Sequence, residues 1–397
     1  MLTLEKVYNA SYVLRDIIRR TDLIHAPKIN PDCTVYLKPE NLQITGSFKV
    51  RGSYYKISQL TDEEKKRGVI ACSAGNHAQG VAMAATKNGI NSLICLPKGA
   101  PISKVEATKN YGADVCLVDG VYDDAYAKAL ALKDEKGYTF IHPFDDVDVI
   151  AGQGTIGLEL LEQMHDIDAV VVPIGGGGLI SGVAFAIKSI NPKVKVYGVQ
   201  ASGAPSMFNS IANARRERLA AVSTIADGIA VKEPGSNTFD YCRQFVDEIV
   251  TVNDDEISTA ILALMEHQKL IAEGAGAVSV AAVMFNKLDL RGKKVVCVVS
   301  GGNIDVTILS RIVNRGMIKT GRQCSLNIEL MDIPGQLTNV TNILAVQGAN
   351  VISVLDDRTS SNTNINGCLL HITIETRDAE HVAQIKSAIE AGGYKIQ

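Results

Sequence analysis

Short, continuous runs of apolar residues recur from the start of the chain to about residue 318, and each is followed by a segment with helical periodicity. Runs such as AVVVPI and VVCVV do not alternate polar and apolar residues, which indicates strands that are buried on both faces. The intervening segments, such as AQGVAMAATKNG, end in glycine. Strands that alternate with helices form parallel sheets with helices on both faces. We therefore predict an α/β fold with two open parallel-sheet subdomains in a domain over 1–318, the smaller over about 50–145.

The pattern changes near residue 320. From 323 to 397 the segments follow the order β-α-β-β-α-β, which predicts a ferredoxin-like domain. Polar and apolar residues alternate in SLNIEL and LLHITIET, so we expect these strands to be antiparallel and exposed on one face.

The charge composition excludes some classes of partner. The 397 residues include 40 basic and 43 acidic side chains, so no excess charge indicates binding to nucleic acid or to a membrane surface. Glu5 and Lys6 interrupt the start of the chain, which lacks the pattern of a signal peptide. The uncharged run 169–187 is long enough to cross a membrane, but Pro173 and four successive glycines favour a strand, a loop and a helix.

The cysteines and histidines indicate a reduced protein without a metal site. The eight cysteines form no C-x-x-C pair and several lie in apolar runs, which predicts buried thiols in the cytoplasm. The seven histidines show no H-E-x-x-H spacing, so we predict no metal.

Three predicted strands end in loops of small residues: ACSAGNHAQG (71–80), PIGGGGLISG (173–182) and VVSGGN (298–303). In open α/β sheets, ligands bind outside the carboxyl ends of the strands. We therefore expect the three loops to form one site.

The glycine loop, Gly175, Gly176, Gly177 and Gly178, follows a strand and precedes a helix. Its backbone N–H groups and the positive helix end suit a phosphate, although a tight turn alone is the alternative. Ser181 replaces the third glycine of G-x-G-x-x-G, and the next strand ends in Gln200 instead of an acidic residue. Since G-x-x-x-x-G-K-[ST] is also absent, a ligand with a single phosphate is favoured over a dinucleotide or a nucleoside triphosphate.

Lys49, in TGSFKVRG, is predicted in the first turn of a helix. The positive potential there disfavours an ammonium group and lowers its pKa. A lysine with a lowered pKa is a nucleophile toward aldehydes, although a lysine exposed at the surface is the alternative. Together with a site for one phosphate, Lys49 indicates pyridoxal phosphate.

The loop SAGNH offers the side chains of Ser73 and Asn76 together with backbone N–H groups. These can bind a carboxylate or a ring hydroxyl, or they can cap the following helix. His77 is compatible with a packed or capping side chain, which is the simpler interpretation, or with a proton carrier. Ser300 is compatible with a contact to a ring nitrogen or with a cap of the next turn.

These loops, with SFKVRG, resemble the pyridoxal-phosphate enzymes of the tryptophan-synthase-β fold over about residues 5–318, and within them the threonine dehydratases most closely. The resemblance implies β-elimination from L-threonine, and from L-serine, to give 2-oxobutanoate or pyruvate and ammonium. Serine racemase or serine dehydratase activity is the alternative enzyme, and a non-catalytic amino-acid sensor is the alternative of another class.

The resemblance also implies roles for individual residues. Lys49 bonds to the cofactor aldehyde and removes the Cα hydrogen, Phe48 packs beside the ring, Asn76 binds the ring hydroxyl, and Ser300 faces the ring nitrogen. Ser73 is the candidate acid for racemisation. The residues around the phosphate are Gly175, Gly176, Gly177, Gly178 and Leu179. Those around the substrate carboxylate are Ser73, Ala74, Gly75, Asn76 and His77.

The segment 323–397 resembles an ACT regulatory domain, with DIPGQL (332–337) as its ligand loop. This implies an amino-acid effector such as isoleucine near Asp332 and Gly335, or else only a helix cap there. It also implies a homodimer or homotetramer, and a segment that mainly holds subunits together is the alternative to a regulatory one. Gln200 stands where relatives often have glutamate. Asp227 and Glu273 lie where relatives can bind a cation, but we predict no metal.

Overall fold

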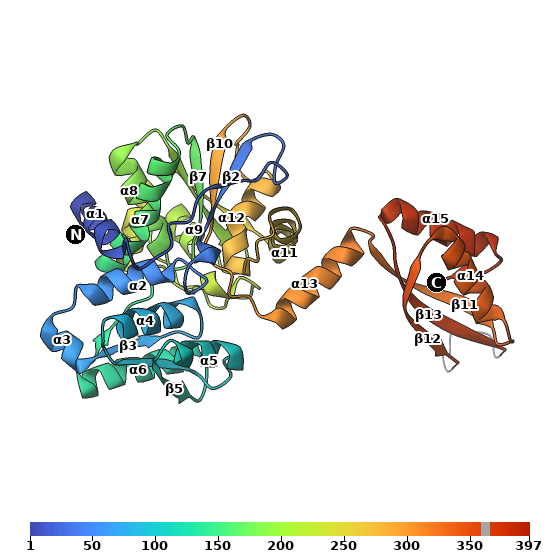
Figure 1. Ribbon diagram of the computed structural model, residues 1–397, viewed down its shortest axis with the longest axis horizontal. Helices are drawn as coiled ribbons and strands as arrows, with labels where there is room; N and C mark the ends of the chain where they lie inside the picture. Colours follow the sequence, from blue (N-terminus) through green and yellow to red (C-terminus); the bar gives the residue numbers. More distant parts are fainter. Residues whose placement is uncertain (359–365) are drawn as a thin grey trace. The chain divides into compact units, whose positions relative to one another are not determined.

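The computed structural model describes residues 1–358 and 366–397 (Figure 1). It divides into two compact units, Met1–Asp305 and Val306–Gln397. In the described part of the chain, no helix is both long enough and apolar enough to cross a membrane.

The first unit contains a large and a small sheet. In the large sheet every neighbouring pair is parallel except β1 and β2. Its strands, in spatial order, are β1 (Ile24–His25), β2 (Thr34–Pro39), β10 (Lys294–Val299), β7 (Ala169–Pro173), β8 (Lys195–Ala201) and β9 (Glu248–Val252). The predicted strand, loop and helix over 169–187 are confirmed as β7, the glycine loop and α8 (Gly178–Ile190).

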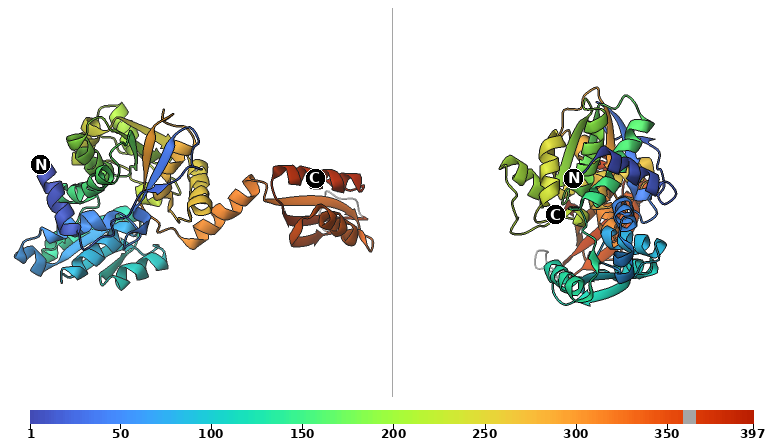
Figure 2. Two further views of the ribbon diagram at one scale, coloured as in Figure 1. Left: turned by 45° about the horizontal axis from the view of Figure 1, so that its top comes forward. Right: turned by 90° about the vertical axis from the view of Figure 1, so that its left-hand side faces the viewer.

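Helices cover both faces of the large sheet (Figure 2). Val172 and Val298 pack into a core with Ile180 of α8 and with α7 (Val147–Gln163). Cys297, which alternates with Val298 along β10, points to the other face and contacts the backbone of α12 (Gly274–Met284). This explains why the strands carry continuous apolar runs.

The small sheet is parallel throughout. Its strands, in spatial order, are β5 (Asp114–Val118), β4 (Ser92–Pro97), β3 (Val69–Cys72) and β6 (Thr139–Phe140). One core packs on α4 (Asn76–Lys87), and another lies between the sheet and α6 (Tyr122–Lys136). The predicted α/β fold with two parallel sheets is therefore confirmed.

The first unit contains further helices besides α4, α6, α7, α8 and α12. They are α1 (Leu4–Leu14), η1 (Glu40–Leu42), α2 (Lys49–Ser58), α3 (Asp62–Arg67), α5 (Ile102–Asn110), α9 (Ser206–Ala212), η2 (Asp227–Ile229), α10 (Ser236–Phe245), α11 (Asp254–Ala263) and the π-helical turn η3 (Leu264–Gln268).

The second unit has one antiparallel sheet in the order β12-β13-β11-β14. Leu326, Ile328 and Leu330 alternate with more exposed residues along β11 and pack against both α14 and α15, so the predicted additional sheet domain is confirmed. Its elements are α13 (Val306–Lys319), β11 (Gln323–Met331), α14 (Gln336–Gln347), β12 (Asn350–Asp357), β13 (Gly367–Glu375), α15 (Ala379–Ala391) and β14 (Lys395–Ile396).

The two compact units divide before α13, whereas the predicted domain limits, 1–318 and 323–397, place this helix with the first domain. These limits stay a prediction.

Candidate active site

Lys49 begins α2, as the position of TGSFKVRG predicts. Gly46 makes a left-handed turn at φ +69°, and the N–H of Phe48 donates to the carbonyl oxygen of Ser300 at 3.1 Å. Ser47 forms an isolated bridge with Gly301. These contacts hold the start of α2 beside the loop that follows β10.

The amine of Lys49 points inward. Its Nζ donates to the carbonyl oxygen of Pro143 at 2.8 Å and lies 5.3 Å from the centre of the Phe48 ring. Burial of the amine lowers the pKa of Lys49 to about 8, against the attraction of Glu273, which raises it. The amine is therefore neutral in a useful fraction of molecules near neutral pH, as a nucleophile requires.

The glycine loop lies between β7 and α8, and its shape requires glycine. Gly177 has φ +99°, and a Cβ there would lie 2.7 Å from Cβ of Thr238. A Cβ at Gly176 would lie 2.5 Å from the ring of Phe144, and one at Gly178 would lie 2.8 Å from the Phe144 backbone. The first intrahelical bond of α8 runs from Ser181 N to Gly177 O, so the N–H groups of its first turn remain available to an anion.

The loop after β6 joins the lysine to the glycine loop. Pro143 accepts the bond from Lys49, and its neighbour Phe144 packs on Gly176 and Gly178. His142 Nδ1 accepts from the N–H groups of Phe144 at 3.2 Å and of Asp145 at 2.8 Å, which shapes this loop. The amine and the glycine loop therefore belong to one site.

The loop 142–145 was missed by the sequence analysis. It contains HPFD after a short strand, and its position at the carboxyl end of a parallel strand is the signal that could have identified it. Asp145 also accepts from Ser236 N and Asn237 N, both at 2.9 Å, and so caps α10.

Asn76 begins α4, and both ends of its side-chain amide are engaged. Its Nδ2 donates to Oε1 of Glu273 at 2.6 Å, and its Oδ1 accepts from Nδ2 of Asn303 at 2.7 Å. Ser73 Oγ accepts from the N–H of Gly75 at 3.1 Å, which forms the local turn. The side chain of Asn76 is thus not used as a helix cap, whereas Ser73 stabilises the loop.

His77 is buried. Its Nε2 lies 2.8 Å from the carbonyl oxygen of Ile141, and burial, reinforced by the charge of Lys49, lowers the pKa of His77 to about 3. A neutral, packed histidine agrees with the simpler of the two sequence interpretations.

Glu273 precedes α12 and is only 4% exposed. Burial, followed by repulsion from Asp227, raises the pKa of Glu273 to about 7, although Asn76, Lys104 and Lys49 favour its charged form. The sequence analysis placed Glu273 only where relatives can bind a cation, and it did not single out Asn303.

Ser300 directly follows β10 and is buried. Its Oγ donates to the carbonyl oxygen of Ala275 at 3.2 Å, which leaves the lone pairs of the hydroxyl as acceptors. Hydrogen bonds thus join the loop after β10 to the start of α2, through Ser300 and Phe48, and to the start of α4, through Asn303 and Asn76.

The residues of this site fit pyridoxal phosphate. A phosphate can occupy the glycine loop at the start of α8, and the amine of Lys49 reaches the same region through Pro143 and Phe144. Asn76 and Ser300 add polar groups from the loops after β3 of the small sheet and β10 of the large sheet. Among the described residues, no group of three or more histidine, cysteine or acidic side chains is placed to hold a metal ion.

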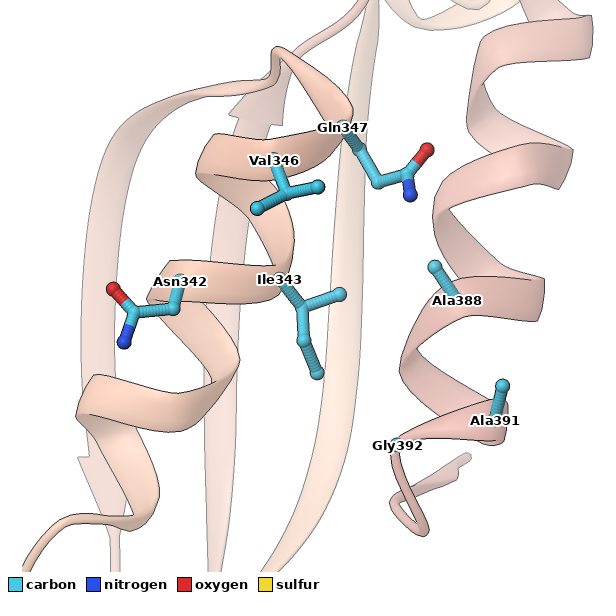
Figure 3. A pocket seen from close by; sticks show the side chains of 7 residues that line it. All are labelled: Asn342, Ile343, Val346, Gln347, Ala388, Ala391 and Gly392. Atoms are coloured by element: carbon cyan, nitrogen blue, oxygen red, sulfur yellow. The ribbon is translucent and has the colours of Figure 1, made fainter.

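The predicted effector residues lie in the second unit. Gly335 precedes α14 with φ +95°, and Asp332 forms an ion pair with Arg358 at 3.3 Å. An open hollow between α14 and α15 is lined by Ile343, Val346 and Ala388 and includes neither Asp332 nor Gly335 (Figure 3).

The known proteins to which this chain is similar include pyridoxal-phosphate dependent enzymes. The family model "Pyridoxal-phosphate dependent enzyme" matches residues 14–301. The L-threonine ammonia-lyase of Thermotoga maritima is 50% identical over 399 residues, which cover 100% of this chain and 99% of the relative.

Two solved structures are also similar. The processed form of threonine deaminase isoform 2 from Solanum lycopersicum has a TM-score of 0.75 at 38% identity and covers 79% of this chain and 88% of its own. Maize serine racemase has a TM-score of 0.75 at 34% identity and covers 80% of this chain and 98% of its own. The chain therefore belongs to the pyridoxal-phosphate dependent enzyme family.

Proposed function

We propose that this protein is a threonine ammonia-lyase, which converts L-threonine to 2-oxobutanoate and ammonium and acts on L-serine in the same way. The observation that carries the proposal is the inward-pointing amine of Lys49, which meets the glycine loop through the adjacent residues Pro143 and Phe144. The relative from Thermotoga maritima, similar over the whole chain, supports threonine as the substrate.

The cofactor, when bound, supplies an electron sink for the charge that develops at Cα of the substrate. Gly175, Gly176, Gly177, Gly178 and Leu179 would hold its phosphate, and Lys49 would bond to its aldehyde. Asn76 and Ser300 would contact the ring at its oxygen and its nitrogen.

The protein's own contribution to catalysis begins with a proton transfer. The free, neutral amine of Lys49 would take the Cα proton of the substrate, and its lowered pKa of about 8 leaves a useful fraction of it unprotonated near pH 8. Ser300 would face the ring nitrogen with a neutral hydroxyl and, to donate to that nitrogen, would turn its hydrogen away from the carbonyl oxygen of Ala275. Since a hydroxyl would not stabilise a protonated ring as a carboxylate would, this residue would favour loss of the β-hydroxyl of the substrate over transamination.

The substrate carboxylate would bind at the loop 73–77. Ser73, Ala74 and Gly75 form the turn between β3 and α4, and Asn76 and His77 begin α4, where the N–H groups of a helix start suit a carboxylate. The packed, neutral His77 would contribute its backbone there, and not a charge.

Serine racemisation remains the second candidate, because the similar maize structure is a serine racemase. It requires an acid on the opposite face of Cα, for which Ser73 is the candidate. A non-catalytic amino-acid sensor is disfavoured, since binding alone does not require a buried amine with a lowered pKa.

The test is an assay of the purified protein with L-threonine and L-serine, in which 2-oxo acid, ammonium and D-serine are measured. We expect a yellow preparation and rapid formation of 2-oxobutanoate. Lys49→Ala should be colourless after dialysis and inactive, whereas Lys98→Ala, at an exposed lysine paired with Asp119, should behave as the wild type. D-serine appearing faster than pyruvate would favour the racemase, and a wild type that stays colourless with added cofactor would refute the enzyme.

We also propose that 323–397 is an ACT domain that binds an amino acid such as isoleucine near Asp332 and Gly335, in a homodimer or homotetramer. The left-handed Gly335 before α14 leaves backbone N–H groups at a helix start, which suit a carboxylate. Isoleucine titration of the full chain and of Asp332→Ala, with the molecular mass measured in parallel, tests this. The eight cysteines, free in the described residues, support a cytoplasmic location.

A further inference from the structure

The side chain of Asn76 is held by two residues that are distant in the sequence. Glu273 accepts from its Nδ2 at 2.6 Å, and Nδ2 of Asn303 donates to its Oδ1 at 2.7 Å. Asn303 Nδ2 also donates to the carbonyl oxygen of Thr45 at 2.8 Å, so its own orientation is defined. These contacts form a continuous hydrogen-bond network from Thr45 to Glu273.

This hydrogen-bond network determines the orientation of the Asn76 amide, that is, the positions of its oxygen and its nitrogen. If the amide rotated by half a turn, its Nδ2 would face the Nδ2 of Asn303, and two donors would oppose each other. Its Oδ1 would at the same time face Oε1 of Glu273, and two acceptors would oppose each other. Both contacts therefore favour the same orientation.

One hydrogen of Asn76 Nδ2 remains for a ligand. An amide nitrogen carries two hydrogens, and one of them is donated to Glu273. In the described part of the chain, the other has no acceptor. Asn76 begins α4 after the carboxyl end of β3, where ligands bind in open α/β sheets, so we expect the second N–H to face the ligand.

The backbone around Glu273 is built to admit its carboxylate. A Cβ at Gly301 would collide with Oε1 of Glu273, and the N–H of Glu273 donates to the carbonyl oxygen of Gly301 at 3.1 Å. The charged groups that face Glu273 are Asp227 of η2, Lys104 of α5 and Lys49 of α2. Lys104 and Asp227 are themselves paired at 2.6 Å, which leaves Asn76 as the hydrogen-bond partner of Glu273.

We propose that Glu273 and Asn303 are positioning residues that lock the Asn76 amide with an N–H toward the ring oxygen of the cofactor. They thereby give the site its preference for a pyridine ring that carries an oxygen next to the aldehyde. The proposal rests on the proposed function, because it takes pyridoxal phosphate as the ligand of the site.

The test compares two ligands on the cofactor-free full-length protein. Pyridoxal 5'-phosphate and its 3-deoxy analogue, which lacks only the ring oxygen, are titrated, and the ratio of their dissociation constants is the readout. This ratio cancels effects that act through the amine of Lys49 or through the phosphate. We expect the wild type to prefer pyridoxal phosphate by roughly tenfold, as one charge-assisted hydrogen bond allows.

Asn303→Asp is the decisive variant, because it keeps the shape and replaces the donor by an acceptor. The introduced carboxylate would oppose Oδ1 of Asn76, whereas Glu273 would still accept from Nδ2, so the two contacts would favour opposite orientations and the N–H would no longer be held toward the ring oxygen. The preference should fall to about one, with affinity for the 3-deoxy analogue unchanged within about twofold. Asn30→Asp is the matched control, at a buried asparagine outside the site that donates to the carbonyl oxygen of Val283 at 2.7 Å.

Glu273 is tested in the same way. Glu273→Gln retains an oxygen that accepts from Asn76 and should keep most of the preference, whereas Glu273→Ala should lose it. Melting curves of the cofactor-free variants establish that each protein is folded.

The outcomes separate the two proposals. A wild type that binds neither aldehyde refutes the proposed function. A wild type that binds both equally, or an Asn303→Asp variant that retains the preference or weakens both ligands to the same extent, refutes only the role of Glu273 and Asn303.

Discussion

The strongest stability prediction concerns Arg51, which lies in α2 two positions after Lys49 and is fully buried. Its guanidinium donates to both carboxylate oxygens of Glu40, at 2.8 Å each, and to Glu159 at 2.6 and 3.0 Å. Lys38, also fully buried, donates to Glu159 at 2.6 Å. Two positive and two negative side chains thus balance one another between β2, α2 and α7.

The replacement Arg51→Met keeps an apolar stem and removes one of the positive charges. Burial alone would lower the pKa of Arg51, but Glu40 and Glu159 outweigh burial and raise it, so the arginine is charged. The variant leaves one negative charge uncompensated in a region without solvent. Removing one partner of a buried pair costs about 3–5 kcal/mol, and we expect a loss of this size in the free energy of unfolding.

The assay is urea unfolding of the holoprotein, followed by the absorbance of the bound cofactor, which reports on the first unit. Arg20→Met is the matched control, because Arg20 pairs with Glu162 at the surface and should contribute less than about 1 kcal/mol. The double variant Arg51→Met with Glu40→Gln restores the charge balance. It should recover about 1–2 kcal/mol relative to Arg51→Met alone.

Two results would refute the reasoning. The first is an Arg51→Met protein as stable as the Arg20→Met control. The second is a double variant that is less stable than Arg51→Met, which would mean that the cluster acts through shape and not through charge balance.

Three further predictions address the site. The rate at which the cofactor-free protein bonds pyridoxal phosphate should rise with pH and level off above about 8, since Lys49 is then neutral; a rise that continues to pH 10 in stopped-flow absorbance would contradict its lowered pKa. Gly177→Ala should weaken cofactor affinity by about tenfold or more in a titration, because of its φ of +99° and the approach to Thr238, whereas Gly292→Ala, at φ +72° with no atom within 4 Å, should not. Because the folded state raises the pKa of Glu273 from 4.5 to about 7, its protonation stabilises the fold fully below pH 4.5, and this contribution is lost as the pH rises to 7. The free energy of unfolding of the cofactor-free protein, measured by urea titration, should therefore decline over this range by up to about 3 kcal/mol. Glu273→Gln should show a smaller decline, and equal slopes in both proteins would contradict the raised pKa.

Much of the site could be predicted because its signals are local. The start of a helix at Lys49 and the strand, glycine loop and helix around Gly177 each depend on residues within a few positions of one another. The proximity of the loops after β7 and β10 followed from a general rule, since the carboxyl ends of parallel strands lie at one edge of a sheet. The loop after β3 belongs to the other sheet, and only the tertiary structure joins it to the loop after β10, through Asn76 and Asn303. The role of each predicted site residue toward the cofactor stays a prediction that the proposed assays test.

The sequence by itself determined the parallel sheets, the additional domain and the type of chemistry, because apolar periodicity, glycine loops and a lysine at a helix start are properties of short segments. Only the tertiary structure decided which polar side chains meet. Asn76 lies 197 positions from Glu273 and 227 from Asn303, and Arg51 lies 108 from Glu159. An isolated glutamate or asparagine carries no local signal of its partner, because a buried polar group is satisfied by whatever the folded chain places within about 3 Å of it.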